Sequence, residues 1–171
     1  WSGMYGSPGC PGVAALHEEL TWISRFLCYS LEKEAKYDGQ GIKTFISPDW
    51  TLEYDIALSG LKKEFYTAVL RAEKIKNSDT YGLTPEKIAE VNKKVETDFT
   101  AWTSERKTDQ EIAKAIYEGY MLDKKISKSI VAQCFTSLLK KCERIEERIE
   151  ADEKLKYLVD AIKYVTEWQV R

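Results

Sequence analysis

Apolar residues recur every three or four positions along most of the chain, which is the spacing of one face of an α-helix. The clearest seam consists of Ile88, Val91, Val95, Phe99 and Trp102. Alternating strand patterns are scarce, and glycine and proline are few outside the first twelve residues. The pattern therefore predicts an all-α fold, an antiparallel helical bundle of five to six helices. More than about 60% of residues should be helical, against the usual third.

Capping signals divide this pattern into separate helices. An N-cap Ser or Thr followed by Pro, or by Glu three residues later, is typical of a helix start. We expect helices at about residues 13–37, from 48 to about 76, from 85 through Trp102, from 108 to about 121, at about 124–150 and from near 152 onward. The start signals are Ser47-Pro48-Asp49, Thr84-Pro85-Glu86 and the pair Thr108 and Glu111. The seam of 124–150 keeps a heptad phase like that of a coiled coil until it breaks near Asp152.

The width of each apolar face indicates how deeply a helix is buried. The helix from residue 85 has one narrow seam, so we expect it on the outside of the bundle, with Trp102 contributing less to stability than Leu138. The last helix is apolar on two faces. Its Leu158, Ile162 and Val165 should join this chain's own core, and its aromatic residues form the second face.

The N-terminal residues differ from the rest of the chain. Residues 1–12 place glycine at every third position, with two prolines between, which is too short a repeat for a collagen helix. We expect residues 1–12 to be a Gly/Pro-rich lead-in and residues 13–171 to form a single helical-bundle domain. The chain begins with Trp1 in place of Met, and a removed targeting segment and an expression boundary both fit this start.

Charge excludes two classes of partner. The net charge of −2, with Lys and Arg spread among Asp and Glu, provides no field to attract nucleic acid or anionic lipid. The longest nearly apolar stretch, residues 130–139, is too short to cross a bilayer, so we expect no transmembrane segment.

Candidate chemistry is weak. His17 is the only histidine, and no cysteine pair has zinc-ligand spacing, so we expect no metal and no cofactor. The stretch from Gly39 to Thr44 ends like a phosphate-binding loop, but Ile42 separates its last glycine from Lys43. We therefore expect no enzyme. A cofactor-free enzyme that works with carboxylates, Tyr or Lys alone is the third alternative for function.

The four cysteines, Cys10, Cys28, Cys134 and Cys142, permit two disulfides. Cys134 and Cys142 are about 12 Å apart on one helix, which is too far for a bond between them. We expect two disulfides, at least one of which ties residues 1–28 to the helix at 124–150. This pairing favours a secreted or cell-surface protein. The alternative is four reduced, buried thiols in a reducing compartment.

The aromatic second faces of the first and last helices suggest the function. Trp and Tyr with one buried and one polar end are typical of interfaces, so Trp22, Tyr157, Tyr164 and Trp168 are the predicted partner-binding residues. A competing interpretation is that these two helices are the central pair of the bundle. The prediction is a non-enzymatic protein–protein interaction module, either an effector-like or antigen-like protein or an accessory subunit. The rival class is a carrier of a small apolar ligand between these helices.

Overall fold

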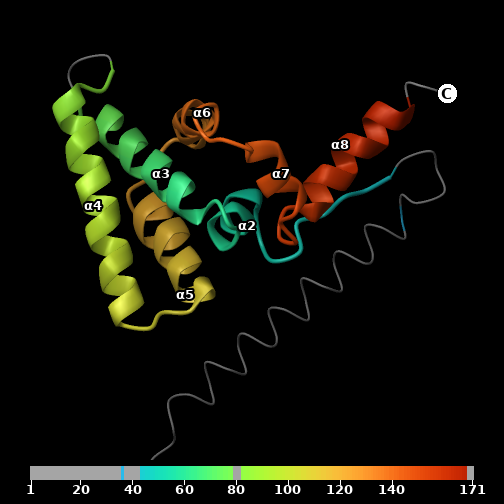
Figure 1. Ribbon diagram of the computed structural model, residues 1–171, viewed down its shortest axis with the longest axis horizontal. Coiled ribbons are helices and arrows are strands. Elements are labelled where there is room, and N and C mark those ends of the chain that lie inside the picture. The colour runs from blue at the N-terminus through green and yellow to red at the C-terminus, as the bar shows by residue number, and fades with distance from the viewer. Residues whose placement is uncertain (1–35, 37–42, 79–81, 169–171) are drawn as a thin grey trace, which may run out of the picture. The chain divides into compact units, whose positions relative to one another are not determined.

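Helices make up all the regular structure in the part of the chain that the computed structural model describes, and this confirms the all-α fold (Figure 1). That part comprises residue 36, residues 43–78 and residues 82–168, with the backbone alone at 167 and 168. The elements are α2 (Leu52–Leu58), α3 (Lys62–Lys76), α4 (Pro85–Ser104), α5 (Asp109–Lys114), the π-helical η1 (Ala115–Leu122), α6 (Lys128–Leu139), α7 (Ile145–Glu150) and α8 (Lys156–Trp168). None of the helices in this described part is long and apolar enough to cross a membrane.

The chain divides into two compact units, residues 1–46 and 47–171, and the following description concerns the second. Of the expected helix at 13–37, only Lys36 lies among the described residues, and it is helical. The rest of that helix, with Trp22, and the lead-in at 1–12 lie outside the described residues.

Two of the capping signals begin helices as predicted. The Thr84 side chain accepts a hydrogen bond from the Lys87 N–H, and Pro85 takes the first position of α4. The Thr108 and Glu111 side chains each accept a hydrogen bond from the backbone N–H of the other, forming the capping box that starts α5. These local signals were sufficient because their partners lie three residues away.

The helix start predicted at Ser47-Pro48-Asp49 was wrong. Thr51, not Ser47, caps α2, and the expected single helix is interrupted between Leu58 and Lys62. Ser59 has an extended backbone, and its hydroxyl donates to the Ile56 carbonyl at 2.7 Å and accepts from the Leu61 N–H at 3.1 Å. A serine side chain that bonds nearby backbone groups in this way competes with the helix ladder.

The expected helix at 124–150 is also interrupted, between α6 and α7. Arg144, which precedes α7, has a left-handed backbone with φ of 51°. Its side chain pairs with Glu147, three residues later. The break near Asp152 is confirmed, because α7 ends at Glu150 and α8 begins at Lys156.

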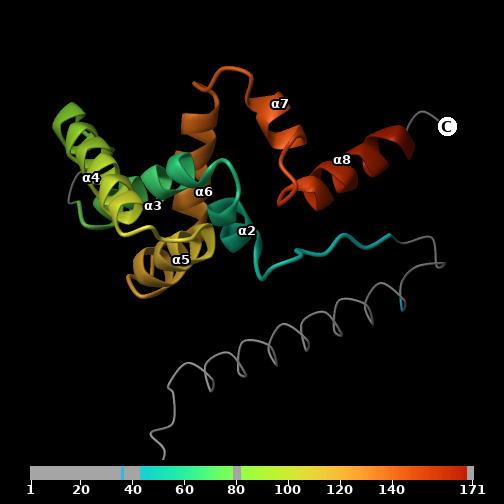
Figure 2. The ribbon, with the colours of Figure 1, turned by 60° about the horizontal axis from the view of Figure 1, so that its bottom comes forward.

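Helix α3 lies at the centre of the second unit and contacts α2, α4, α6 and η1 (Figures 1 and 2). Its Phe65, Tyr66 and Val69 are almost fully buried. The placement of Trp102 on the periphery was wrong, because Trp102 is 7% exposed and lies against the Tyr66 and Phe99 rings. A single narrow seam puts α4 on one side of the core, and Val91, Val95 and Trp102 of that seam are buried.

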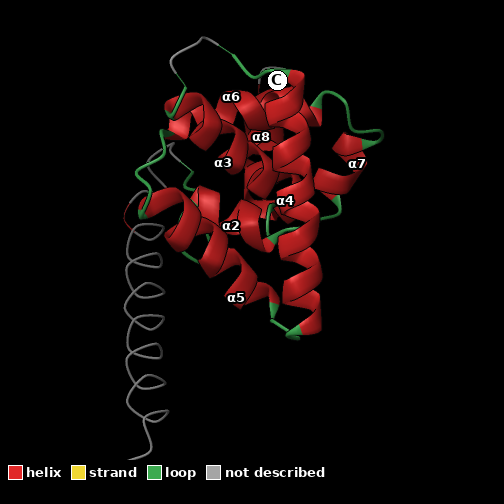
Figure 3. Cartoon of the chain, turned by 90° about the vertical axis from the view of Figure 1, so that its left-hand side faces the viewer, coloured by secondary structure: helices red, strands yellow, loops and turns green. Residues whose placement is uncertain are grey.

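The described residues form only helices and loops, as Figure 3 shows. Helix α8 contacts α7 and exposes part of its apolar surface. Ile162 and Val165 are 65% and 60% exposed. The expectation that these two side chains would join the core was wrong. They lie three positions apart, so they share one face of α8, and that face is exposed.

Candidate binding pocket between α3 and α4

A pocket of about 350 Å³ lies between α3 and α4. Its lining from α3 consists of Leu70, Glu73, Lys74 and Asn77. Its lining from α4 consists of Lys87, Glu90, Val91 and Lys94, and Lys124 closes it from the turn after η1. The helices run antiparallel, because Lys74 pairs with Glu90 while the earlier Tyr66 bonds the later Asp98.

Helical spacing places these side chains on facing stripes. Lys87, Val91 and Lys94 follow steps of four and three, which share one face of α4. Leu70 and Val91 are 3% and 2% exposed and form an apolar floor. Charged groups therefore stand at the rim, above two buried aliphatic side chains.

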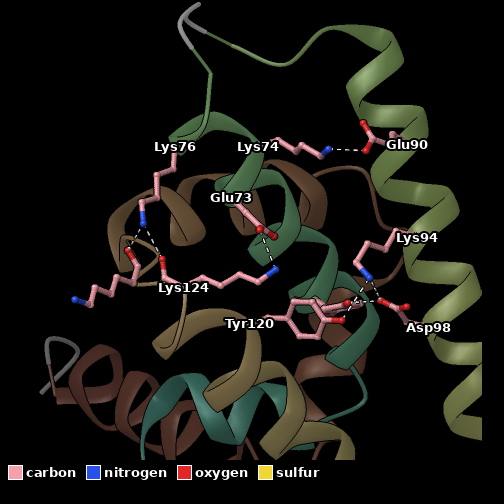
Figure 4. A network of polar contacts seen from close by, with 10 residues as sticks. Glu73, Lys74, Lys76, Glu90, Lys94, Asp98, Tyr120 and Lys124 are labelled. Atoms are coloured by element: carbon pink, nitrogen blue, oxygen red, sulfur yellow. Dashed lines mark hydrogen bonds and ion pairs between the residues drawn. The ribbon is translucent and has the colours of Figure 1, made fainter.

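The rim carries four lysines and two glutamates, and Asp98 beside it pairs with Lys94, which leaves one positive group in excess. The Lys74 ammonium lies 2.6 Å from Glu90 and the Lys124 ammonium 2.8 Å from Glu73, and Figure 4 draws both pairs. Both pairs are partly exposed, so each contributes little to stability. Lys87 differs, because within the described part of the chain its ammonium donates only to the Ser78 hydroxyl, at 2.8 Å.

Tyr120 of η1 links two of the lysines (Figure 4). The ammonium groups of Lys124 and Lys94 lie 4.6 and 5.3 Å from the centre of its ring, within cation–π range. Lys94 also donates to Asp98 at 2.8 Å and to the Tyr120 hydroxyl at 3.4 Å. Burial alone would lower the pKa of Lys94, but these hydrogen bonds outweigh it and raise the pKa above its ordinary value. Lys94 is therefore a fixed cation.

A second layer holds this arrangement in place. The Tyr66 hydroxyl donates to Asp98, so the acceptor of Lys94 is itself anchored in the core. The Lys76 ammonium donates to the carbonyl of Lys124 at 2.7 Å and ties the turn after η1 to the end of α3. A π-helical segment such as η1 is uncommon and occurs often at functional sites.

The predicted partner-binding residues do not form this pocket. Tyr157 and Tyr164 lie on α8 and are both half-buried. The Tyr157 hydroxyl is buried near Asp55, and burial followed by this negative charge raises the pKa of Tyr157. Trp22 and the side chain of Trp168 lie outside the described residues.

The predicted disulfides are also not formed by the cysteines that the structure describes. Cys134 and Cys142 are free, half-buried thiols, so the structure does not support the predicted disulfides. Cys134 lies on α6, which packs against α3, and the thiol of Cys142, which follows the end of α6, donates to the Leu138 carbonyl at 3.5 Å. Cys10 and Cys28 lie outside the described residues.

Sequence reasoning missed the pocket because it treated lysines as solvated surface. The signal that was available is the charged, apolar, charged stripe of Lys87, Val91 and Lys94. Among the described residues, no group of three or more His, Cys, Asp or Glu side chains is placed to hold a metal ion. No known protein family, curated protein or solved structure matches the chain.

Proposed function

We propose that this chain is a non-enzymatic protein-binding module and that the pocket between α3 and α4 takes a negatively charged segment of its partner. The observation that carries the proposal is the set of four ammonium groups around the apolar floor of Leu70 and Val91. This local excess of positive charge occurs in a chain whose net charge is −2. It therefore attracts acidic groups to one place rather than to the whole surface.

The existing ion pairs favour such an exchange. Glu90 and Glu73 hold Lys74 and Lys124 over the pocket at partly exposed positions. A partner's carboxylates can join or replace them at little cost, because exposed pairs contribute only about 0.2–1 kcal/mol each. Affinity must then come partly from an apolar side chain on the floor, at about 25 cal/mol per Å² buried.

The state of the lysines supports binding over catalysis. A nucleophilic lysine needs a depressed pKa, so that its amine is neutral near pH 7. Hydrogen bonds to Asp98 and Tyr120 raise the pKa of Lys94 in spite of its partial burial. A permanently charged ammonium suits recognition of a carboxylate.

The proposed setting is a secreted or surface-displayed protein, or an accessory subunit of a larger assembly. A disulfide between Cys10 and Cys28 would support the first setting, because disulfides persist in oxidising compartments. Peptide mapping of unreduced protein from its natural source distinguishes the two settings.

The function is tested with a fluorescein-labelled peptide of seven glutamates and fluorescence anisotropy at two salt concentrations. We expect binding to the wild-type protein that weakens as salt rises, because exposed charges are screened. Lys87→Glu with Lys94→Glu should weaken binding at least about tenfold, or about 1.4 kcal/mol.

The matched control is Lys140→Glu with Lys141→Glu, which changes the net charge equally at exposed positions that do not border this pocket. We expect it to change the dissociation constant less than about twofold, the effect of a general field alone. Equal losses in both variants, or no salt-dependent binding to the wild type, would contradict the proposed function.

A further inference from the structure

We infer that the segment recognised by the pocket is an extended peptide with two acidic residues four positions apart and an apolar residue midway between them. This inference rests on the proposed function and adds the spacing of the partner's side chains. It is drawn from the order of charged and apolar residues along α4 and from the cations that stand at either end of the pocket.

Cations stand at both ends of the pocket with the apolar floor between them. Lys94 and Lys124 share the Tyr120 ring at one end. Lys87 lies at the other end of the α4 stripe, and Lys74 lies nearer the middle, on Glu90, which is three residues after Lys87 and four before Lys94. At 1.5 Å per residue, the Cα atoms of Lys87 and Lys94 are about 10.5 Å apart.

An extended peptide reproduces this pattern. Its side chains alternate between two sides, so residues i, i+2 and i+4 point the same way, and at about 3.3 Å per residue the outer two are about 13 Å apart. The flexible lysine side chains accommodate the difference from the backbone spacing. The middle residue then faces Leu70 and Val91, and its apolar side chain replaces water above a floor that is already buried.

A helical ligand does not fit as well. A helix with its side chains is about 10–12 Å across. The Lys74–Glu90 ion pair joins α3 to α4 at 2.6 Å among the residues that line the pocket, so a ligand of that width would have to break it. A small ligand with one anionic group, such as phosphate, reaches the cations at only one of the two ends.

Three short peptides of equal length separate these possibilities, with binding measured by calorimetry. The matched peptide is Ser-Glu-Ser-Leu-Ser-Glu-Ser. The rearranged peptide, Ser-Glu-Glu-Leu-Ser-Ser-Ser, has the same composition but adjacent acids. The third replaces the leucine of the matched peptide with serine. We expect the matched peptide to bind about fivefold more tightly than each of the others, because each lacks one end contact or the apolar contact.

Single variants then assign each acid to its end of the pocket. Lys87→Ser and Lys94→Ser should each weaken the matched peptide by about fivefold. Inorganic phosphate at the concentration of the matched peptide should not displace it. Displacement by phosphate at that concentration would overturn the two-ended site.

The failures of the two proposals are distinguishable. If the matched and rearranged peptides bind equally and both lose affinity in the Lys87→Glu, Lys94→Glu variant, the spacing inference is wrong and the proposed function stands. If neither these peptides nor the glutamate peptide binds, the proposed function is wrong as well.

Discussion

The backbone N–H of Gly60 donates a 2.7 Å hydrogen bond to Oδ2 of Asp152, a residue 92 positions later in the chain. The Arg148 guanidinium donates to the carbonyl of the same glycine at 2.9 Å and to Glu64 at 2.8 Å. Residues around α7 thus satisfy the backbone groups that the interruption between α2 and α3 leaves unpaired. A Cβ at Gly60 would stand 3.3 Å from the Asp152 carboxylate, a tight contact that glycine avoids.

Asp152→Ala should therefore lower the free energy of unfolding by about 1–2 kcal/mol, because a hydrogen bond to a charged acceptor is lost and the break between α2 and α3 loses its distant partner. The midpoint of urea unfolding measures the effect at equal slope. Glu153→Ala removes a neighbouring, exposed carboxylate and should change the midpoint little. Equal midpoints for the two variants would refute the structural role of this contact.

The interruption also shows how much of the fold the sequence predicts. Capping at Thr84 and Thr108 depends on residues one turn away, and those starts were predicted correctly. The breaks at Ser59–Leu61 and at Arg144 were missed. Apolar spacing continues through both, and the groups that stabilise the first break are Arg148 and Asp152 from the far end of the chain. Periodicity predicts helices, but it does not show where tertiary contacts interrupt them.

Burial of Trp102 reverses the order of stability that its seam suggested. Trp102 is 7% exposed, with its ring centre 5.3 Å from that of Tyr66, whereas Leu138 is only half-buried. Trp102→Ala should cost about 3–5 kcal/mol and Leu138→Ala about 2 kcal/mol or less. Urea unfolding of both variants checks the order. A larger loss at Leu138 would contradict the packing of α4 against α3.

The candidate site could be predicted less well than the fold. The pocket combines α3, α4 and the turn after η1, and no single segment shows that combination. The stripe of Lys87, Val91 and Lys94 was readable, but it resembles any amphipathic helix surface until Leu70 and Tyr120 are placed beside it. For the predicted site on α8, the spacing of the aromatic residues could be read from the sequence. The elements against which those residues pack could not.

The free thiols of Cys134 and Cys142 should both react with an alkylating reagent under denaturing, non-reducing conditions. In the native protein, Cys134 should react more slowly than an unfolded thiol, because burial raises its pKa and thereby lowers the thiolate fraction. Mass spectrometry of peptides checks both results. A disulfide at either residue would contradict the structure and restore the predicted link to residues 1–28.

Asp55 gives the protein a specific dependence on pH. Its carboxylate is 0% exposed, and only one of its oxygens, Oδ2, has a regular hydrogen bond, from the Ser47 hydroxyl at 2.6 Å. Burial, with a smaller contribution from the negative charge of Asp49, raises the pKa of Asp55, and the hydrogen bond from Ser47 and the nearby Tyr157 hydroxyl offset only part of this rise. The neighbouring charges are Asp49, which pairs with Lys154 at 2.9 Å, and Glu53.

The sign of the effect follows from proton binding. An unfolded aspartate has a pKa of about 3.9, so the folded state binds more protons than the unfolded state between that value and the raised pKa of Asp55. Its contribution to stability is therefore greatest at acid pH and falls as pH rises through the folded pKa.

Asp55→Asn removes this dependence while keeping an oxygen that can accept from Ser47. Relative to the wild type, the variant should gain stability between pH 4 and pH 7, by about 1.4 kcal/mol for each unit of raised pKa. Urea unfolding of both proteins at the two pH values measures the gain.

Asp160→Asn, which removes a partly exposed carboxylate of α8, controls for the loss of one charge. Carboxylates with a lowered pKa, such as Glu53 and Glu111, act in the opposite direction but remain in every variant, so only the difference between proteins is diagnostic. A gap between wild type and Asp55→Asn that stays constant with pH would show that the Asp55 carboxylate titrates alike in the folded and unfolded chains.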